Sequence, residues 1–265
     1  MNNKSRIASI LQTPCLDTSV TGLPTFSLTQ LDVSKKLIFS LPTNVRLGHL
    51  AEKVVSETIK LSKNYNVLYE NIQILKEKKT IGELDFIIQE VVKEELMHLE
   101  IAYKFYLYDP SISSEVVKNW IGPNRNDSLY EKLEKLNKKQ FPLLYHNETK
   151  SRLAIVNANE ISQALCLLVN LFIPYRCKED FLPVYQRAVK GYYIDYETFG
   201  SLDNSHKNYF IPPRKEWGID PSENEAWSNY NAIKDDIEVS IREQQAALIW
   251  QKEVDTYSQF FLVWW

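Results

Sequence analysis

The hydrophobic period of the chain changes between Asn44 and Tyr108, and this change limits the possible folds more than any other feature. Residues Asn44–Leu61 carry apolar side chains at steps of three and four, which predicts an amphipathic helix. Asn66–Leu75, Thr80–Val91 and Leu96–Tyr108 are then rich in Val, Ile, Leu, Tyr and Phe, and charged turns separate them. That pattern predicts an antiparallel meander of three strands. A helix followed by such a meander places the chain in the α/β class.

The composition is that of an ordinary globular protein. Of 265 residues, 44% are hydrophobic and 25% are charged, which is enough to bury a sizeable core. The net charge of −3 means that nucleic acid would have to be bound by a local basic patch.

Three cysteines without metal-ligand spacing favour a reducing compartment. Residues 1–15 lack a signal-peptide core, and the longest apolar run, Ala164–Pro174, is too short to cross a bilayer. We therefore expect a cytoplasmic protein with no membrane association, and the oligomeric state is left open.

Three consecutive parts are expected along the chain. Residues 1–25 are rich in Ser, Thr, Asn and Gln without periodicity, which predicts partial disorder. Residues 26–148 would form the core, including a helix over Asp127–Gln140. Residues 149–265 would form an α+β half, and whether it packs on the core as one unit is open. Its predicted elements are a helix over Asn159–Leu168, strands at Val169–Ile173, Gly191–Tyr196 and Asn208–Ile211, a long helix over Ser222–Lys252 and a closing strand in QFFLVWW.

Charged side chains interrupt two of the most apolar predicted strands. Glu83 and Asp85 share one face of the second strand, because side chains alternate with a period of two. His98, Glu100 and Lys104 share one face of the third strand by the same rule. Strands with such apolar neighbours are usually central, so charges on them must be paired, hydrated in a cleft or bound to a metal.

Two carboxylates on adjacent strands, Asp85 and Glu100, form a suitable oxygen site for Mg²⁺ or Mn²⁺. A lysine beside them, Lys104, would orient or deprotonate an attacking water and stabilise charge on a phosphate. The same residues would also serve as a purely structural ion-pair network, and their spacing leaves both interpretations open.

Two motifs carry a family resemblance. Gly82–Phe86, followed one hairpin later by His98–Phe105, resembles the PD-(D/E)XK nuclease superfamily. More narrowly, the chain resembles an uncharacterised bacterial family described as domain of unknown function 1853, through the segments LGHLAE, TIGELDFII, HLEIAYKFYL, WIGPNRND, KKQFPL and YSQFFLVWW. The resemblance implies a restriction-endonuclease-like core, with a helix and an antiparallel meander in a mixed sheet, and a second α+β half. It also implies metal-dependent hydrolysis of nucleic-acid phosphodiester bonds.

The resemblance assigns roles to individual residues. Asp85 and Glu100 would be catalytic metal carboxylates, Glu83 a further metal ligand, Lys104 the catalytic lysine and Glu52 the helix glutamate. Glu100 and Lys104 are four positions apart instead of the superfamily's two, which is about 13 Å along a strand instead of about 6.6 Å. Both side chains would have to lean together, or the strand would have to bulge. Glu52 lies off the apolar stripe of its helix, so a solvated role for it is equally open.

Five further residues are candidates for substrate binding: His98, Asn124, Arg125, Lys132 and Gln140. A lone strand histidine is more often a hydrogen-bonded structural residue, which is the favoured interpretation of His98. The WIGPNRND loop would present amides and a guanidinium to phosphate, or would be a packed corner. The main alternative to a nuclease is a non-enzymatic module that keeps the fold and binds nucleic acid or a protein partner.

Overall fold

The computed structural model describes residues 3–33, 37–153, 157–202 and 204–265. In these residues the fold is α/β, and ten strands belong to a mixed sheet. Contacts divide the chain into unit 1 (Met1–Pro14, Lys104–Tyr130 and Val169–Trp265) and unit 2 (Cys15–Tyr103 and Glu131–Leu168). The α/β class and the mixed sheet are therefore confirmed, whereas a restriction-endonuclease-like core stays a prediction.

The units interleave along the chain, whereas the sequence predicted consecutive parts with a division near residue 148. Strands β4 (Leu96–Tyr108) and β6 (Ser162–Pro174) each contribute residues to both units. A long apolar strand that serves two units leaves no change of composition to mark a boundary.

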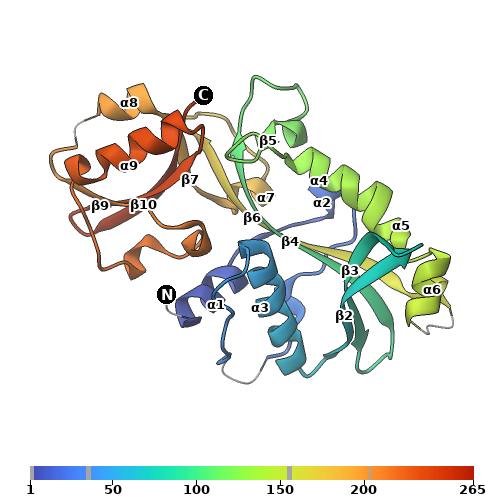
Figure 1. Cartoon of the computed structure of the whole chain (residues 1–265). Coiled ribbons are helices and arrows are strands. Elements are labelled where there is room, and N and C mark those ends of the chain that lie inside the picture. The colour runs from blue at the N-terminus through green and yellow to red at the C-terminus, as the bar shows by residue number, and fades with distance from the viewer. Residues whose placement is uncertain (1–2, 34–36, 154–156, 203) are drawn as a thin grey trace. The chain divides into compact units, whose positions relative to one another are not determined.

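The predicted helix and meander are confirmed in unit 2 (Figure 1). Strands β2 (Tyr65–Lys76) and β3 (Lys79–Glu90) form a long antiparallel hairpin, and β3 pairs with β4 in turn. In that pairing Phe86 faces Leu99 and Ile87 faces His98. The regular pairing ends at Phe86 and Leu99, and the next residues are Asp85 on β3 and Glu100 on β4. A two-residue strand, β1 (Cys15–Leu16), pairs antiparallel with β6.

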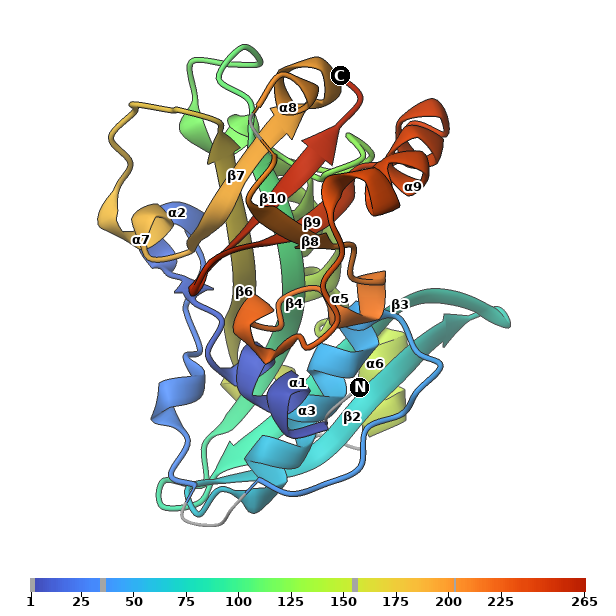
Figure 2. The ribbon, with the colours of Figure 1, turned by 90° about the vertical axis from the view of Figure 1, so that its left-hand side faces the viewer.

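Helix α3 (Leu47–Leu61) packs along the β2–β3 hairpin (Figure 2). Its buried stripe is the one that the sequence predicts and includes Leu50, Ala51, Val54, Val55 and Ile59. Helices α5 (Phe141–Leu143) and α6 (Asn147–Leu153) pack against the same hairpin around a cluster that contains Ile72, Leu84 and Leu143. Unit 2 also contains the short helix α2 (Thr18–Thr21).

The helix predicted over Asp127–Gln140 is present but not uniform. It begins as α4 (Leu129–Lys135) and continues through a π-helical turn, η3 (Leu136–Gln140), directly into α5. Such i→i+5 turns are rare and occur frequently at functional sites.

In unit 1 the strand order is β6, β7 (Val189–Asp195), β10 (Thr256–Val263), β9 (Ala247–Glu253) and β8 (Lys207–Phe210). The first two pairings are parallel and the last two are antiparallel. A short β5 (Trp120–Ile121) pairs with the end of β4. The helices of this unit are α1 (Asn3–Leu11), α7 (Pro183–Gln186), α8 (Tyr196–Gly200) and α9 (Tyr230–Arg242).

Strands β7 and β10 approach each other unusually closely at Gly191. A Cβ atom on this residue would lie 2.0 Å from the backbone oxygen of Gln259. Glycine is therefore required at this position if the parallel pairing is to form.

One helix prediction in the second half is wrong, and another is too long. Residues 162–168 belong to strand β6, because a strand buried on both faces is continuously apolar and its pattern does not differ from that of a buried helix. The long helix over Ser222–Lys252 is limited to α9 and is followed by strand β9. A turn with positive φ at Gln244 separates the two elements. The strands predicted near β7, β8 and β10 are confirmed.

The N-terminal segment, which was expected to be partly disordered over residues 1–25, contains α1, β1 and α2. Ile7 and Ile10 are buried, and the buried Arg6 guanidinium donates a 2.6 Å hydrogen bond to the carbonyl of Trp217. Tertiary contacts that are not visible in the local composition therefore order this segment. In the described residues no helix is both long and apolar enough to span a membrane.

Candidate functional site

Asp85 and Glu100 occupy the centre of the candidate site, on the adjacent strands β3 and β4 of unit 2. Asp85 is partly buried, and its Oδ2 accepts a 2.8 Å hydrogen bond from the backbone N–H of Ile101. Glu100 is fully buried. The hydrogen bond to Ile101 and the effect of the Glu100 charge on Asp85 therefore place the two predicted carboxylates in one site.

The surroundings of Asp85 disfavour its charged form. Burial raises the pKa of its carboxyl well above the usual value, and the negative charges of Glu100 and Glu52 raise it further. The hydrogen bond from Ile101 and the positive charge of Lys132 act in the opposite direction and do not compensate. Two acidic groups are therefore held together at an energetic cost, which is a frequent mark of a functional site.

Glu100 is fixed by hydrogen bonds to both of its oxygens. Its Oε1 lies 2.8 Å from His98 Nε2, and its Oε2 accepts a 2.6 Å bond from the side-chain amide of Gln140. Gln140 comes from the π-helical turn η3, so this turn supplies one of the groups that hold the carboxylate. The structure therefore places His98 and Gln140, two of the candidates for substrate binding, against Glu100.

Glu52 and Glu83 lie at a pocket of about 310 Å³ beside α3. Glu52 Oε2 is 3.0 Å from His49 Nδ1, and the Glu52 side chain is only 21% exposed. Its charge acts on Asp85, so it belongs electrostatically to the candidate site although it lies off the apolar stripe. Glu70 also lines the pocket, with the neutral Ser56 and Asn71, so the pocket has three glutamates and one lysine, Lys53.

Asn71 is a residue of this site that sequence reasoning missed. It lies on β2 between Glu70, which pairs with Phe86, and Ile72, which pairs with Leu84, and is thus the neighbour of Asp85 across the hairpin. Its φ of 53° is left-handed, a conformation that is uncommon within a strand. Backbone strain of this kind clusters at functional sites. The available signal was an asparagine, a residue that tolerates left-handed backbone, within an otherwise regular strand pattern.

Lys132 supplies a positive charge to the carboxylates from α4. Eight α-helical residues make about 2.2 turns and would rotate Gln140 by about 80° from Lys132. The wider turn at Leu136–Gln140 rotates less per residue and brings the two side chains back toward a common face. The predicted substrate-binding residues Lys132 and Gln140 therefore act on Asp85 and Glu100 respectively.

Lys104 belongs to unit 1, where its ammonium donates a 2.6 Å bond to Asp127 Oδ2. Both side chains are partly exposed, at 34% and 44%. Asp127 also covers Gly122, where a Cβ would meet its carboxylate at 2.0 Å. Lys104 thus stabilises the WIGPNRND loop, and its predicted catalytic role stays a prediction.

The other two predicted residues of this loop are held by groups of unit 1. The Arg125 guanidinium lies 3.1 Å from Asp109 Oδ2 and 4.4 Å from the ring centroid of Trp265. Asn124 Oδ1 accepts a 2.8 Å bond from the backbone N–H of Ala246. These contacts match the packed-corner interpretation of the loop.

No group of three or more His, Cys, Asp or Glu side chains is arranged to hold a metal within the part of the chain that the structure describes. Mg²⁺ usually keeps several waters and is held by one or two carboxylates. Asp85 and Glu100 form such a pair, with oxygen donors, negative charge and partial burial. Their chemistry therefore fits a hard divalent cation.

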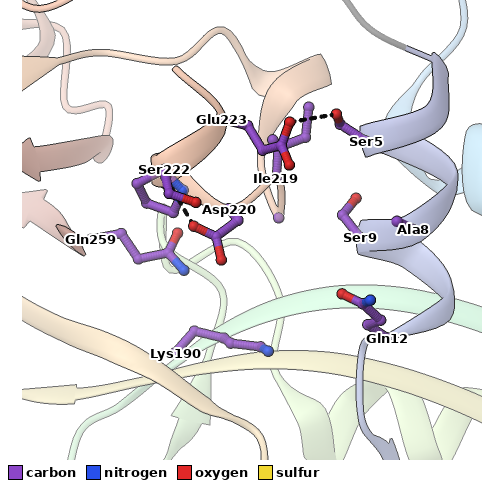
Figure 3. A pocket seen from close by; sticks show the side chains of 12 residues that line it. Ser5, Ala8, Ser9, Gln12, Lys190, Ile219, Asp220, Ser222, Glu223 and Gln259 are labelled. Carbon is purple, nitrogen blue, oxygen red and sulfur yellow. Dashed lines mark hydrogen bonds between the residues drawn. The ribbon is translucent and has the colours of Figure 1, made fainter. Parts of the chain in front are cut away.

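Unit 1 has a polar pocket of its own, of about 270 Å³, between α1 and the segment around η6 (Pro221–Glu223) (Figure 3). Lys190, Asp220 and Gln259 line it, and Ser5 Oγ donates a 3.0 Å bond to Glu223. None of the sequence-predicted site residues contributes to this pocket.

Comparisons with known proteins identify one relationship. No curated protein and no solved structure matches the chain. The model of the family described as domain of unknown function (DUF1853) matches residues 18–259, a range that includes Asp85 and Glu100. The chain therefore belongs to the DUF1853 family.

Proposed function

We propose that this protein is a metal-dependent phosphodiesterase that hydrolyses nucleic acid, with its centre at Asp85 and Glu100. The observation that carries the proposal is the closeness of these two carboxylates on neighbouring strands, where burial and the charge of Glu100 raise the Asp85 pKa. A structural role alone would be served at lower cost by an apolar pair or by a carboxylate with a cation. A divalent cation would relieve the repulsion.

The resemblance of Gly82–Phe86 and His98–Phe105 to the PD-(D/E)XK superfamily supports the same proposal. The motifs lie on β3 and β4, and α3 packs beside them on the hairpin. This arrangement agrees with the restriction-endonuclease-like core that the resemblance implies.

In this proposal the residues of unit 2 have different roles. Asp85 and Glu100 would hold Mg²⁺ or Mn²⁺, with Glu83 as a further carboxylate at the neighbouring pocket. A bound divalent ion would polarise the phosphate and acidify a water molecule. Lys132 would offset negative charge around Asp85, and Glu52 would accept hydrogen bonds or a proton at the acidic pocket.

The test is calorimetric titration of Mn²⁺ into the wild type and into Asp85→Asn, with folding checked by circular dichroism. The expected result is saturable binding by the wild type and its loss in a folded Asp85→Asn protein. Cleavage of single-stranded and duplex DNA and RNA, with and without Mn²⁺, then tests the reaction. Folded wild-type protein that binds no Mn²⁺ either alone or with nucleic acid would contradict the proposal.

A second candidate is a non-catalytic module that binds nucleic acid or a protein partner. It is favoured by the lack, in the described residues, of any group of three metal-ligating side chains and by the ion pair between Lys104 and Asp127. This candidate predicts nucleic-acid binding in a gel-shift assay that is independent of Mn²⁺ and unchanged in Asp85→Asn.

A further inference from the structure

We infer that His98 is a positioning residue: it holds the Glu100 carboxylate through a hydrogen bond from its Nε2–H. We also infer that Gln163 keeps the imidazole proton on Nε2. Gln163 lies near the start of β6 and belongs, with His98 and Glu100, to unit 2. The inference rests on the proposed function, because the hydrogen bonds among Gln163, His98 and Glu100 would orient Glu100 for binding a metal ion.

The proton position on His98 follows from its neighbours. The side-chain amide nitrogen of Gln163 donates a 2.8 Å bond to the backbone carbonyl of Phe141, and a carbonyl can only accept. The same nitrogen lies 3.0 Å from His98 Nδ1, so Nδ1 faces a donor and is the acceptor. The remaining proton of a neutral imidazole then resides on Nε2. From there it is donated to Glu100 Oε1 over 2.8 Å.

The hydrogen-bonded pair of His98 and Glu100 is buried. His98 and Glu100 side chains are both 0% exposed. The Phe141 ring packs against the imidazole, edge to face, with 5.6 Å between the ring centroids. The tautomer and the ring orientation of His98 therefore depend on its contacts with Gln163 and Phe141. His98 therefore contacts Glu100 and not a bound substrate.

The consequence for Glu100 is a carboxylate of fixed orientation. His98 holds Oε1 and Gln140 holds Oε2, so both oxygens of the carboxylate have a fixed hydrogen-bond partner. Each carboxylate oxygen has about two acceptor sites, so one on each oxygen is left for a ligand. Hydrogen-bond partners of this kind behind a metal carboxylate typically contribute about 10–100-fold to metal affinity.

The first measurement is of the tautomer and needs no metal. The chain has only four histidines, so ¹⁵N-histidine NMR spectra are simple, and the signals lost in His98→Gln assign His98. The expected wild-type spectrum has a protonated Nε2 and an unprotonated Nδ1 on His98. In Gln163→Met, which keeps the side-chain length but removes the donor, the Nδ1 shift should change. A wild-type His98 protonated on Nδ1 would overturn the inference.

The second measurement is Mn²⁺ affinity in variants whose folding is checked by circular dichroism. His98→Leu removes the donor and should weaken Mn²⁺ binding by about 10–100-fold. His98→Gln places an amide N–H within similar reach and should recover most of the loss, which a role in packing alone would not give. The exposed His146→Gln is the matched control and should bind as the wild type does.

The outcomes separate this inference from the proposed function. Wild-type binding that is equally strong in folded His98→Leu would overturn the inference and leave the proposed function intact. Wild type that binds no Mn²⁺, alone or with nucleic acid, would overturn both the proposed function and the positioning role, even with His98 in the expected tautomer. Binding weakened equally in His98→Leu and His98→Gln would overturn the assignment of the Nε2 donor.

Discussion

Burial and the nearby charge of Glu100 on β4 together raise the pKa of Asp85 on β3 well above its usual value. The fold thus brings together two like charges that local packing alone would separate. His98 and Gln140 hold one member of the pair, and the backbone N–H of Ile101 holds the other. A ligand that bound here would meet two buried or partly buried oxygen donors whose orientation these hydrogen bonds fix.

Asp85→Asn should stabilise the metal-free protein at neutral pH. Because the folded-state pKa of Asp85 is raised, its favourable contribution is present below the unfolded pKa of about 3.9 and is lost as pH rises through the folded value. Asparagine keeps an oxygen for the Ile101 N–H but carries no charge. We expect a Tm increase of about 2–4 °C for each kcal/mol of relieved repulsion. Differential scanning fluorimetry from pH 4 to pH 8 measures it, and a lower Tm for the variant at pH 7 would contradict this account.

Lys132→Met and Lys104→Met should have different effects. Lys132 acts electrostatically on Asp85, so its loss should lower stability at neutral pH and reduce Mn²⁺-dependent cleavage. Lys104 forms a partly exposed ion pair with Asp127, so its loss should cost only about 0–1 kcal/mol of unfolding free energy. Chemical denaturation and initial cleavage rates compare the two variants. A larger loss of cleavage in Lys104→Met than in Lys132→Met would contradict this expectation and support the catalytic role predicted for Lys104.

Asp109→Asn should reduce stability at neutral pH and have little effect in acid. Burial alone would raise the pKa of Asp109, but hydrogen bonds from Ser111 and the Arg125 guanidinium outweigh it and lower the pKa. The stabilising contribution is therefore present above the unfolded pKa of about 3.9 and is lost as pH falls through the lower folded value. Urea unfolding at pH 7 and pH 3 measures the difference. The exposed Asp235→Asn serves as the control, and an equal loss at both pH values would argue against the ionic account.

Gly191→Ala should be strongly destabilising, whereas Gly48→Ala should not. The new Cβ at residue 191 would lie 2.0 Å from the Gln259 carbonyl oxygen, which forces β7 and β10 apart. At Gly48, in helix α3, nothing lies within 4 Å of the new Cβ, and alanine should gain about 0.5–1 kcal/mol from helix propensity. Thermal unfolding of the two variants checks both directions. A Gly191→Ala protein as stable as the wild type would show that the two strands can separate without loss.

The sequence determined the first half of unit 2 through local periodicity. The steps of three and four in α3, and the apolar strands separated by charged turns in β2, β3 and β4, are properties of consecutive residues. The alternation of side chains on β3 and β4 also determined that Asp85 and Glu100 lie on defined faces. These features were predictable because the physics that produces them acts within one element.

Tertiary structure decided what each charge contacts. The sequence could not show that Lys104 pairs with Asp127, that Gln163 reaches His98, or that a π-helical turn brings Gln140 to Glu100. Nor could it show the first part of β6, residues 162–168, where burial on both faces removes the alternation that marks a strand. Partners that are distant in sequence leave no periodic signal, so the candidate carboxylates could be named from the sequence, whereas the groups that hold them became visible only in the fold.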